Sequence, residues 1–220
     1  MEEQLVQVPA GAVTLDGNLG VPADARGIVL FAHGSGSSRH SPRNRYVAGV
    51  LREAGLATVL MDLLTADEEA IDLRTQRLRF DISLLADRLV GATDWLARNP
   101  DTRDLTIGYF GASTGAAAAL VAAAERPNAV GAIVSRGGRP DLAGAALARV
   151  RAPTLLIVGG NDIPVIGMNQ EAMAQLHAET KLEIVPGATH LFEEPGALEE
   201  VACLAREWFE RYLSGRQHSS

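Results

Sequence analysis

Residues 105–124 read LTIGYFGASTGAAAALVAAA, and this stretch decides the fold. The apolar run Leu105–Phe110 indicates a buried strand, and the alanine-rich run that opens at Thr114 indicates a helix. Between them stands Gly111-Ala112-Ser113-Thr114-Gly115, a Gly-x-Ser-x-Gly motif. A serine on a sharp strand-to-helix turn needs small residues two positions to either side, and both are glycine here. The stretch therefore predicts a nucleophile elbow that carries Ser113.

Short apolar runs alternate with helical segments on both sides of this stretch. Strands that are covered on both faces are apolar throughout, as expected in a parallel sheet. Besides Leu105–Phe110, the predicted strands are Gly27–Ala32, Ala57–Met61, Ala129–Ser135, Thr154–Val158 and Lys181–Val185. Before them, Gln4–Val8 and Ala12–Leu19 are predicted to form an antiparallel pair, with Asp16-Gly17 as a turn signal in or near the second strand.

The segments between the strands have helical periodicity. In Thr75–Arg98 the apolar residues fall three or four apart and predict one long helix, which Asn99-Pro100 ends. A second such stripe runs through the C-terminal segment at Val201, Ala205, Trp208 and Tyr212, and Cys203 beside it is predicted to be a small core residue. Strands that alternate with helices favour right-handed crossovers and a doubly wound, largely parallel sheet.

A serine hydroxyl is a weak nucleophile at neutral pH and needs an adjacent base. His190 is the candidate, because it follows the last predicted strand and active-site groups gather at the carboxyl ends of parallel strands. The other histidines fit less well: His177 lies inside a predicted helix, His40 lies in a polar loop, and His218 lies in the C-terminal tail.

A carboxylate should hold the histidine in the correct tautomer. Asp162 follows the strand Thr154–Val158 in the sequence Gly159-Gly160-Asn161-Asp162. Alone it would be an ordinary turn or helix-cap aspartate. The chain order Ser113, Asp162, His190 is nevertheless the Ser, Asp, His order expected of an α/β-hydrolase.

Backbone donors for an oxyanion are predicted at two loops. His33-Gly34-Ser35-Gly36 follows the strand Gly27–Ala32, and we assign the N–H groups of Ser35 and Thr114 as the donors. The alternative is a phosphate-binding loop, which is weaker because neither a Gly-Lys-Ser/Thr ending nor GxGxxG spacing is present.

Composition limits the remaining classes of function. The chain has 220 residues, a net charge of −7 and a single cysteine. The acidic balance argues against a nucleic-acid partner, and the lone cysteine favours a reducing compartment. The N-terminus is acidic rather than signal-like and no apolar run is long enough for a membrane span, so a cytoplasmic location without membrane attachment is expected. No metal site and no cofactor are predicted, and the sequence leaves the oligomeric state open.

With these motifs assembled, the chain resembles the α/β-hydrolase superfamily and, within it, the small dienelactone hydrolase family and related short esterases. The resemblance implies an α/β-hydrolase fold with a mostly parallel eight-stranded sheet and helices on both faces. It covers roughly Val6 to Leu213. Residues 1–213 are predicted to form a single domain, followed by a flexible tail at 214–220. Only Gly137–Pro153 separates two of the strands where many relatives insert a cap, so no cap domain is expected.

One departure affects the expected chemistry, because dienelactone hydrolases carry a cysteine where this chain has Ser113. Hydrolysis of a small or exposed ester through an acyl-serine is therefore favoured over enol-lactone activity. Thioester, lactone or peptide-bond cleavage with the same triad remains an alternative, as does a non-catalytic ligand-binding protein. Gly34, Arg39 and Arg136 are the predicted substrate-binding residues, because arginines after two strands of one edge can bind a carboxylate or phosphate. These arginines, with Arg43, Arg45 and Arg139 in the same loops, can equally pair with acids or face water.

Overall fold

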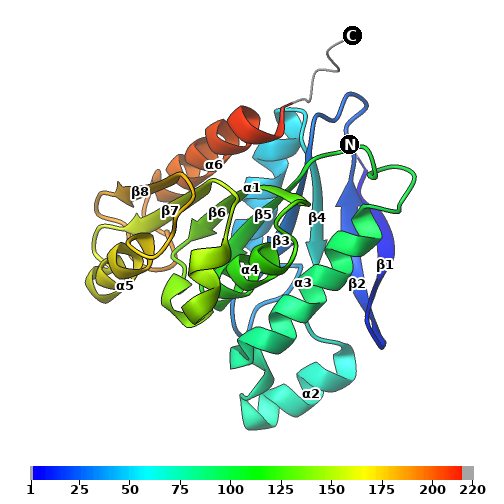
Figure 1. Ribbon diagram of the computed structural model, residues 1–220, viewed down its shortest axis with the longest axis horizontal. Coiled ribbons are helices and arrows are strands. Elements are labelled where there is room, and N and C mark those ends of the chain that lie inside the picture. The colour runs from blue at the N-terminus through cyan, green and yellow to red at the C-terminus, as the bar shows by residue number, and fades with distance from the viewer. Residues whose placement is uncertain (1, 215–220) are drawn as a thin grey trace.

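Eight strands form one sheet in the computed structural model, which describes residues 2–214 (Figure 1). The strand order is β1-β2-β4-β3-β5-β6-β7-β8. Strand β2 is antiparallel to both of its neighbours, and all other neighbouring strands are parallel. The strands are β1 (Gln4–Ala10), β2 (Val13–Gly20), β3 (Ile28–Ala32), β4 (Ala57–Met61), β5 (Ile107–Ala112), β6 (Val130–Arg136), β7 (Thr154–Gly159) and β8 (Thr180–Val185). The predicted mostly parallel, eight-stranded sheet is confirmed.

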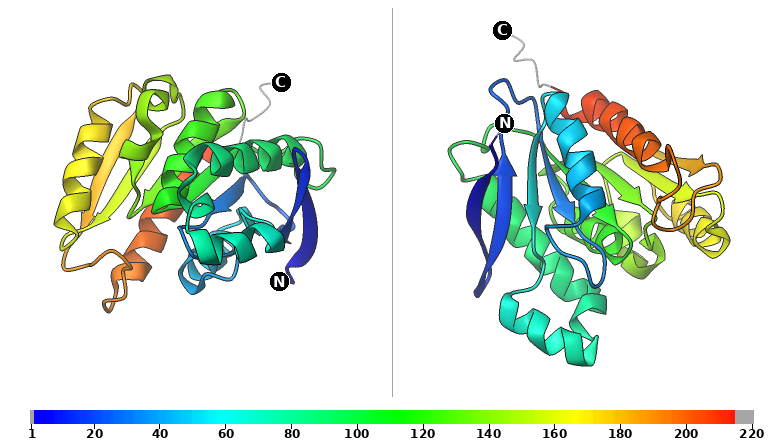
Figure 2. Two further views of the ribbon diagram at one scale, coloured as in Figure 1. Left: turned by 90° about the horizontal axis from the view of Figure 1, so that it is seen from below. Right: turned by 180° about the vertical axis from the view of Figure 1, so that it is seen from behind.

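Helices cover both faces of this sheet (Figure 2). They are α1 (Pro42–Glu53), α2 (Ala66–Thr75), η1 (Leu78–Phe80), α3 (Ile82–Leu96), α4 (Thr114–Glu125), η2 (Pro140–Arg149), α5 (Ile163–Met173) and α6 (Ala197–Leu213). Helices α1 and α6 pack on one face, whereas α3, α4, η2 and α5 pack on the other. Helix α2 projects at the edge where the parallel strands end.

The two-sided covering explains why the central strands are apolar throughout. In β3, Ile28, Leu30 and Ala32 belong to the core under α3 and α4, while Val29 and Phe31 belong to the core under α1 and α6. Side chains alternate between the faces of a strand, so each face needs its own apolar residues. Period-two alternation of polar residues is therefore missing from these strands.

The predicted single helix over Thr75–Arg98 is wrong. Helix α2 ends at Thr75, Gln76 is left-handed, the short helix η1 follows, and α3 begins only after Asp81. The Asp81 carboxylate accepts the N–H of Leu84 and caps α3. The apolar residues keep helical spacing across the break, so periodicity alone does not reveal it. The run Asp67-Glu68-Glu69 forms the first turn of α2, where negative charge is favourable.

Three smaller predictions are also wrong. Asp16-Gly17 lies within β2, paired with β1, and the turn falls at Gly11, whose φ is +64°. His177 lies beyond the end of α5 rather than inside a helix. Cys203 is only half-buried, because the buried face of α6 passes beside it.

No cap domain covers the edge where the parallel strands end, within residues 2–214. Only residues 137–153 connect β6 to β7, and η2 fills most of that length. The carboxyl ends of β3, β5, β7 and β8 therefore lie under loops, and these loops carry the predicted site residues. The predicted tail at 214–220 lies outside the described residues, apart from Ser214.

Candidate active site

Ser113 occupies a strained turn between β5 and α4. Its φ and ψ are 51° and −121°, a conformation that residues with a side chain rarely adopt. Its N–H donates to the carbonyl of Arg136 at 3.3 Å, and its carbonyl accepts the N–H of Arg139 at 3.1 Å. The hydroxyl does not cap α4, although serine at this position usually does. The turn thus holds the serine rigidly and leaves its hydroxyl free.

The two glycines of the motif are required by close packing. A Cβ on Gly115 would lie 2.3 Å from the Ala32 carbonyl oxygen, and a Cβ on Gly111 would lie 2.5 Å from the Cα of Ala116. Both contacts are with backbone, which cannot rotate away. Gly115 therefore allows α4 to approach the end of β3, and this approach brings the loop after β3 beside Ser113.

A Gly115→Ala variant is expected to lower the free energy of unfolding by at least about 2 kcal/mol, because its methyl group would force β3 and α4 apart. Urea denaturation followed by circular dichroism measures the change. Gly167→Ala in α5 is the matched control, since nothing lies within 4 Å of its added Cβ. That control should be neutral or more stable by about 0.4–1 kcal/mol. Equal stability of the two variants would contradict the packing argument.

Asp162 and His190 meet although 28 residues separate them. Asp162 follows β7 and His190 follows β8, and the His190 Nδ1 lies 2.7 Å from the Asp162 Oδ2. The Asp162 side chain does not cap α5 and so remains available to the histidine. As the carboxylate accepts, Nδ1 carries the proton and Nε2 is left to accept one. The Asp162 side chain is 14% exposed and that of His190 is 41% exposed.

Backbone contacts between the two loops set this geometry. The Asn161 N–H donates to the Ala188 carbonyl at 3.0 Å, and the Asn161 amide donates to the Gly187 carbonyl at 3.1 Å. A Cβ on Gly159 would lie 2.4 Å from the Ala188 carbonyl oxygen. Gly159 thus allows the loop after β8 to cross close over the end of β7.

Ser113 and His190 line the same cavity, which has a volume of about 220 Å³. Their side chains are not hydrogen-bonded to each other in this structure, and such contacts often tighten only when a substrate binds. The structure therefore brings the three predicted triad residues to one edge, with the Asp162–His190 bond formed and Ser113 beside the same space.

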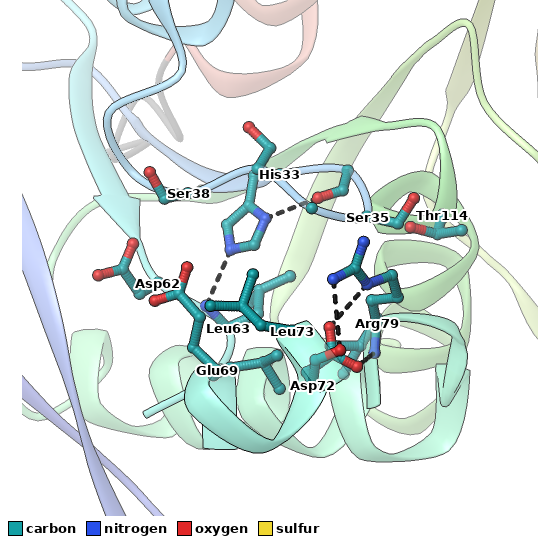
Figure 3. A pocket seen from close by; sticks show the side chains of 15 residues that line it. His33, Ser35, Ser38, Asp62, Leu63, Glu69, Asp72, Leu73, Arg79 and Thr114 are labelled. Atoms are coloured by element: carbon teal, nitrogen blue, oxygen red, sulfur yellow. Dashed lines mark hydrogen bonds and ion pairs between the residues drawn. The ribbon is translucent and has the colours of Figure 1, made fainter. Parts of the chain in front are cut away.

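The loop after β3 passes directly over the elbow. A Cβ on Gly34 would lie 3.3 Å from the Cβ of Ser113, so only glycine leaves this space open. Ser35 lines the cavity that holds Ser113, and Ser35 and Thr114 together line a second cavity of about 120 Å³ (Figure 3). Thr114 is the first residue of α4, where backbone N–H groups have no partner within the helix. Both predicted donor residues thus flank Ser113.

His33 holds this loop in place, a role that no sequence motif indicates. Its Nδ1 donates to the Gly34 carbonyl at 2.9 Å, and its Nε2 accepts the Leu63 N–H at 3.0 Å (Figure 3). Burial lowers the pKa of His33, so the ring is neutral at pH 7. Because the peptide is planar and trans, anchoring the Gly34 carbonyl directs the Ser35 N–H to the opposite side.

The second cavity lies beside α2 and η1. Asp72 is buried there and binds Arg79, whose Nε lies 2.7 Å from the Asp72 Oδ2 (Figure 3). The Asp72 carboxylate also accepts the N–H groups of Leu78 and Arg79. These bonds fix the break between α2 and α3, which is the point where the predicted helix failed.

Arg136 and Arg39, the two arginines predicted to bind substrate, have different surroundings. Arg136 lines the cavity of Ser113, whereas Arg39 does not. Arg39 binds the Asp62 carboxylate and the Asn18 side chain and lines a different cavity from Ser113, so its role in substrate binding stays a prediction. The Asp62 carboxylate also accepts the Arg39 N–H at 2.8 Å and so anchors this loop. Arg139 pairs with Asp141 at 2.8 Å.

The described residues contain no group of three or more His, Cys, Asp or Glu side chains arranged to hold a metal ion. No helix among residues 2–214 has the length and apolar character needed to cross a membrane.

Comparison with solved structures supports this architecture. The crystal structure of a dienelactone hydrolase from Anabaena variabilis is 69% identical, covers 96% of this chain and 98% of its own, and superposes with a TM-score of 0.95. An α/β serine hydrolase without lid from Xanthomonas campestris is 20% identical, with a TM-score of 0.77 over 98% of this chain and 97% of its own. At that identity the second likeness shows the fold alone.

Comparison with curated sequences identifies two longer relatives in Mycobacterium tuberculosis strains, both provisionally named as phosphoribosyl transferases. Each is 60% identical over 215 residues, covering 98% of this chain. The chain spans about half the length of these relatives, 48%. The family model of the dienelactone hydrolases matches residues 15–215. The chain therefore belongs to the dienelactone hydrolase family.

Proposed function

We propose that the protein is a serine hydrolase that cleaves a small or exposed carboxylic ester through an acyl-serine intermediate. The observation that carries this proposal is the Asp162–His190 hydrogen bond at the edge of the cavity that holds the strained Ser113. Family membership makes it a hydrolase of the α/β type, and the Ser113 hydroxyl supplies the nucleophile.

In the proposed mechanism, the Ser113 Oγ attacks the ester carbonyl while the His190 Nε2 takes its proton. The Asp162 carboxylate stabilises the imidazolium that forms. The carbonyl oxygen, now negative, accepts hydrogen bonds from the Ser35 and Thr114 N–H groups, and each such donor is worth about 10²–10³ in rate. His190 then protonates the leaving alcohol. Water attacks the acyl-serine by the same path and releases the acid.

The absence of a cap over this edge, within the described residues, favours small or exposed acyl groups, because no further element encloses a long chain. Thioesters, lactones and peptide bonds would use the same groups, so a substrate panel decides among them. The panel should include lactones, because the 69%-identical protein from Anabaena variabilis is named a dienelactone hydrolase. The transferase name of the longer relatives belongs to proteins of which this chain covers about half, and we do not transfer it.

An active-site probe tests the proposal directly. A fluorophosphonate is expected to label Ser113, because this hydroxyl shares its cavity with His190, which can act as its base. Peptide mass spectrometry of the labelled wild type locates the adduct, and the Ser113→Ala variant should remain unlabelled. Ser83→Ala, on the exposed side of α3, serves as the control and should label like the wild type. If folded wild type stays unlabelled, the non-catalytic binding protein becomes the better interpretation.

A further inference from the structure

Two cavities lie on either side of the Gly34–Ser35 segment, and different residues line them. The 220 Å³ cavity holds Ser113 and His190, whereas the 120 Å³ cavity holds Thr114 and lacks His190. If the protein is the serine hydrolase proposed above, His190 has to protonate the oxygen of the leaving alcohol. The alcohol portion of the ester therefore belongs in the 220 Å³ cavity.

Arg136 in this cavity is a buried charge without a carboxylate. It ends β6 beside Ser113 and is 6% exposed, and its side chain has no hydrogen bond or ion pair with any described residue. The guanidinium carbon of Arg136 lies 5.8 Å from the centre of the Phe192 ring. Burial and the neighbouring Arg43 lower the pKa of Arg136 to about 10, so it remains charged at neutral pH.

Arg88 provides an internal comparison. It is equally buried at 6%, but its guanidinium binds the Glu68 carboxylate at 2.5 Å. Buried charges are ordinarily paired in this way, because an unpaired one loses its hydration without a compensating partner. An arginine that is left unpaired beside a nucleophile is the arrangement expected when the missing anion arrives with the substrate.

Helix α1 adds further donors to the same cavity. Arg43 lines it with its Nε buried and unpartnered, and its Nη1 lies 3.7 Å from the exposed carboxylate of Glu193. Asn44 is 2% exposed and also lines the cavity. The one carboxylate at the triad, Asp162, is already bound to His190. The cavity wall is therefore positive overall.

We propose that the leaving alcohol of the natural ester carries an anionic oxygen group, a carboxylate or a phosphate, which binds the Arg136 guanidinium with Arg43 at the cavity mouth. In acyl transfer the bond between the Ser113 Oγ and the acyl carbon forms, the bond from that carbon to the alcohol oxygen breaks, and the proton of Ser113 passes through His190 to that oxygen. The anionic group does not react. It orients the alcohol.

Three acetyl esters of one phenol scaffold test this inference, with hydroxymethyl, carboxylate or phosphate at the meta position. Each kcat/KM is divided by the rate of hydroxide-catalysed hydrolysis to remove differences in leaving-group reactivity. Wild type should prefer one of the anionic esters over the neutral one by about 10- to 100-fold, the usual range for a charged hydrogen bond. The ester that is preferred tells carboxylate from phosphate.

In Arg136→Met this preference should disappear, so that the ratio of kcat/KM for the anionic ester to kcat/KM for the neutral ester falls to about one. Arg136→Lys should retain part of the preference, because it keeps the charge and loses the paired donors. Arg45→Gln, an exposed position on the same helix as Arg43, is the control and should behave like wild type. Removal of an unpaired buried charge should leave thermal stability unchanged or raise it, so the Met variant is expected to fold.

Equal preference in wild type and Arg136→Met, or no preference in wild type, would overturn the inference. Calorimetric titration with 3-hydroxybenzoate and with 3-hydroxyphenyl phosphate gives a readout that needs no turnover, and Arg136→Met should weaken the tighter of the two by about 10-fold or more. If no ester is cleaved and Ser113 is not labelled, the proposed function fails. The titration still decides whether Arg136 binds the anion.

Discussion

Replacement of Ser113 by alanine is expected to lower kcat for ester hydrolysis by about 10⁵- to 10⁶-fold. The change removes the only nucleophile at the elbow but leaves the Asp162–His190 pair and the backbone donors in place. Pre-steady-state and steady-state assays with an activated ester measure the loss. Residual hydrolysis above that in water should persist, because the donors and the cavity still bind the substrate.

Ser113→Gly separates the loss of chemistry from the relief of strain. The φ of 51° and ψ of −121° at this position suit glycine far better than serine. The glycine variant is therefore expected to be as inactive as the alanine variant but more stable than the wild type by about 1 kcal/mol or more. A fall of less than 10-fold in kcat in either variant would show that Ser113 is not the nucleophile.

Asp162→Asn is expected to lower kcat by about 10⁴-fold with little effect on KM. An amide at this position no longer requires the His190 Nδ1 to carry the proton, so the wrong tautomer is favoured and the imidazolium loses its neighbouring charge. Steady-state kinetics on the same ester measure the effect. Labelling of Ser113 by the fluorophosphonate should slow in parallel, because the same activated hydroxyl reacts.

Asp94→Asn is the matched control for that variant. Asp94 on α3 accepts two hydrogen bonds from Arg126 at 3.0 Å, and Arg126 lowers the pKa of this carboxyl. It lies outside both cavities that flank Ser113, so its loss should leave kcat within about 2-fold. Equal losses in the two variants would mean that Asp162 acts only through stability.

Much of the architecture could be predicted because it depends on local chemistry. The buried strands are apolar throughout, and the glycines around Ser113 meet a local steric need. Each triad residue follows its own strand. In an open parallel sheet the carboxyl ends of the strands share one edge, so position along the chain was enough to predict that Asp162 and His190 would meet.

The break between α2 and α3 could not be predicted from periodicity. It depends on Asp72, whose carboxylate accepts the N–H groups of Leu78 and Arg79, and on the Asp81 cap. Local apolar spacing is the same with or without the break. The break is set by these hydrogen bonds from side chains to the backbone, which the spacing of apolar residues does not record.

The sequence by itself determined the strands of the sheet, the strand-to-helix turn at Ser113 and the order along the chain of the three proposed triad residues. Only the tertiary structure decided which of the arginines are paired and which are not. Arg39 and Arg136 both follow strands of one edge, yet Arg39 is bound by Asp62 and Asn18 while Arg136 is buried without a carboxylate beside Ser113. The reason is physical: local sequence sets backbone propensity and periodicity, whereas the pairing and desolvation of a charge depend on which distant segments pack around it.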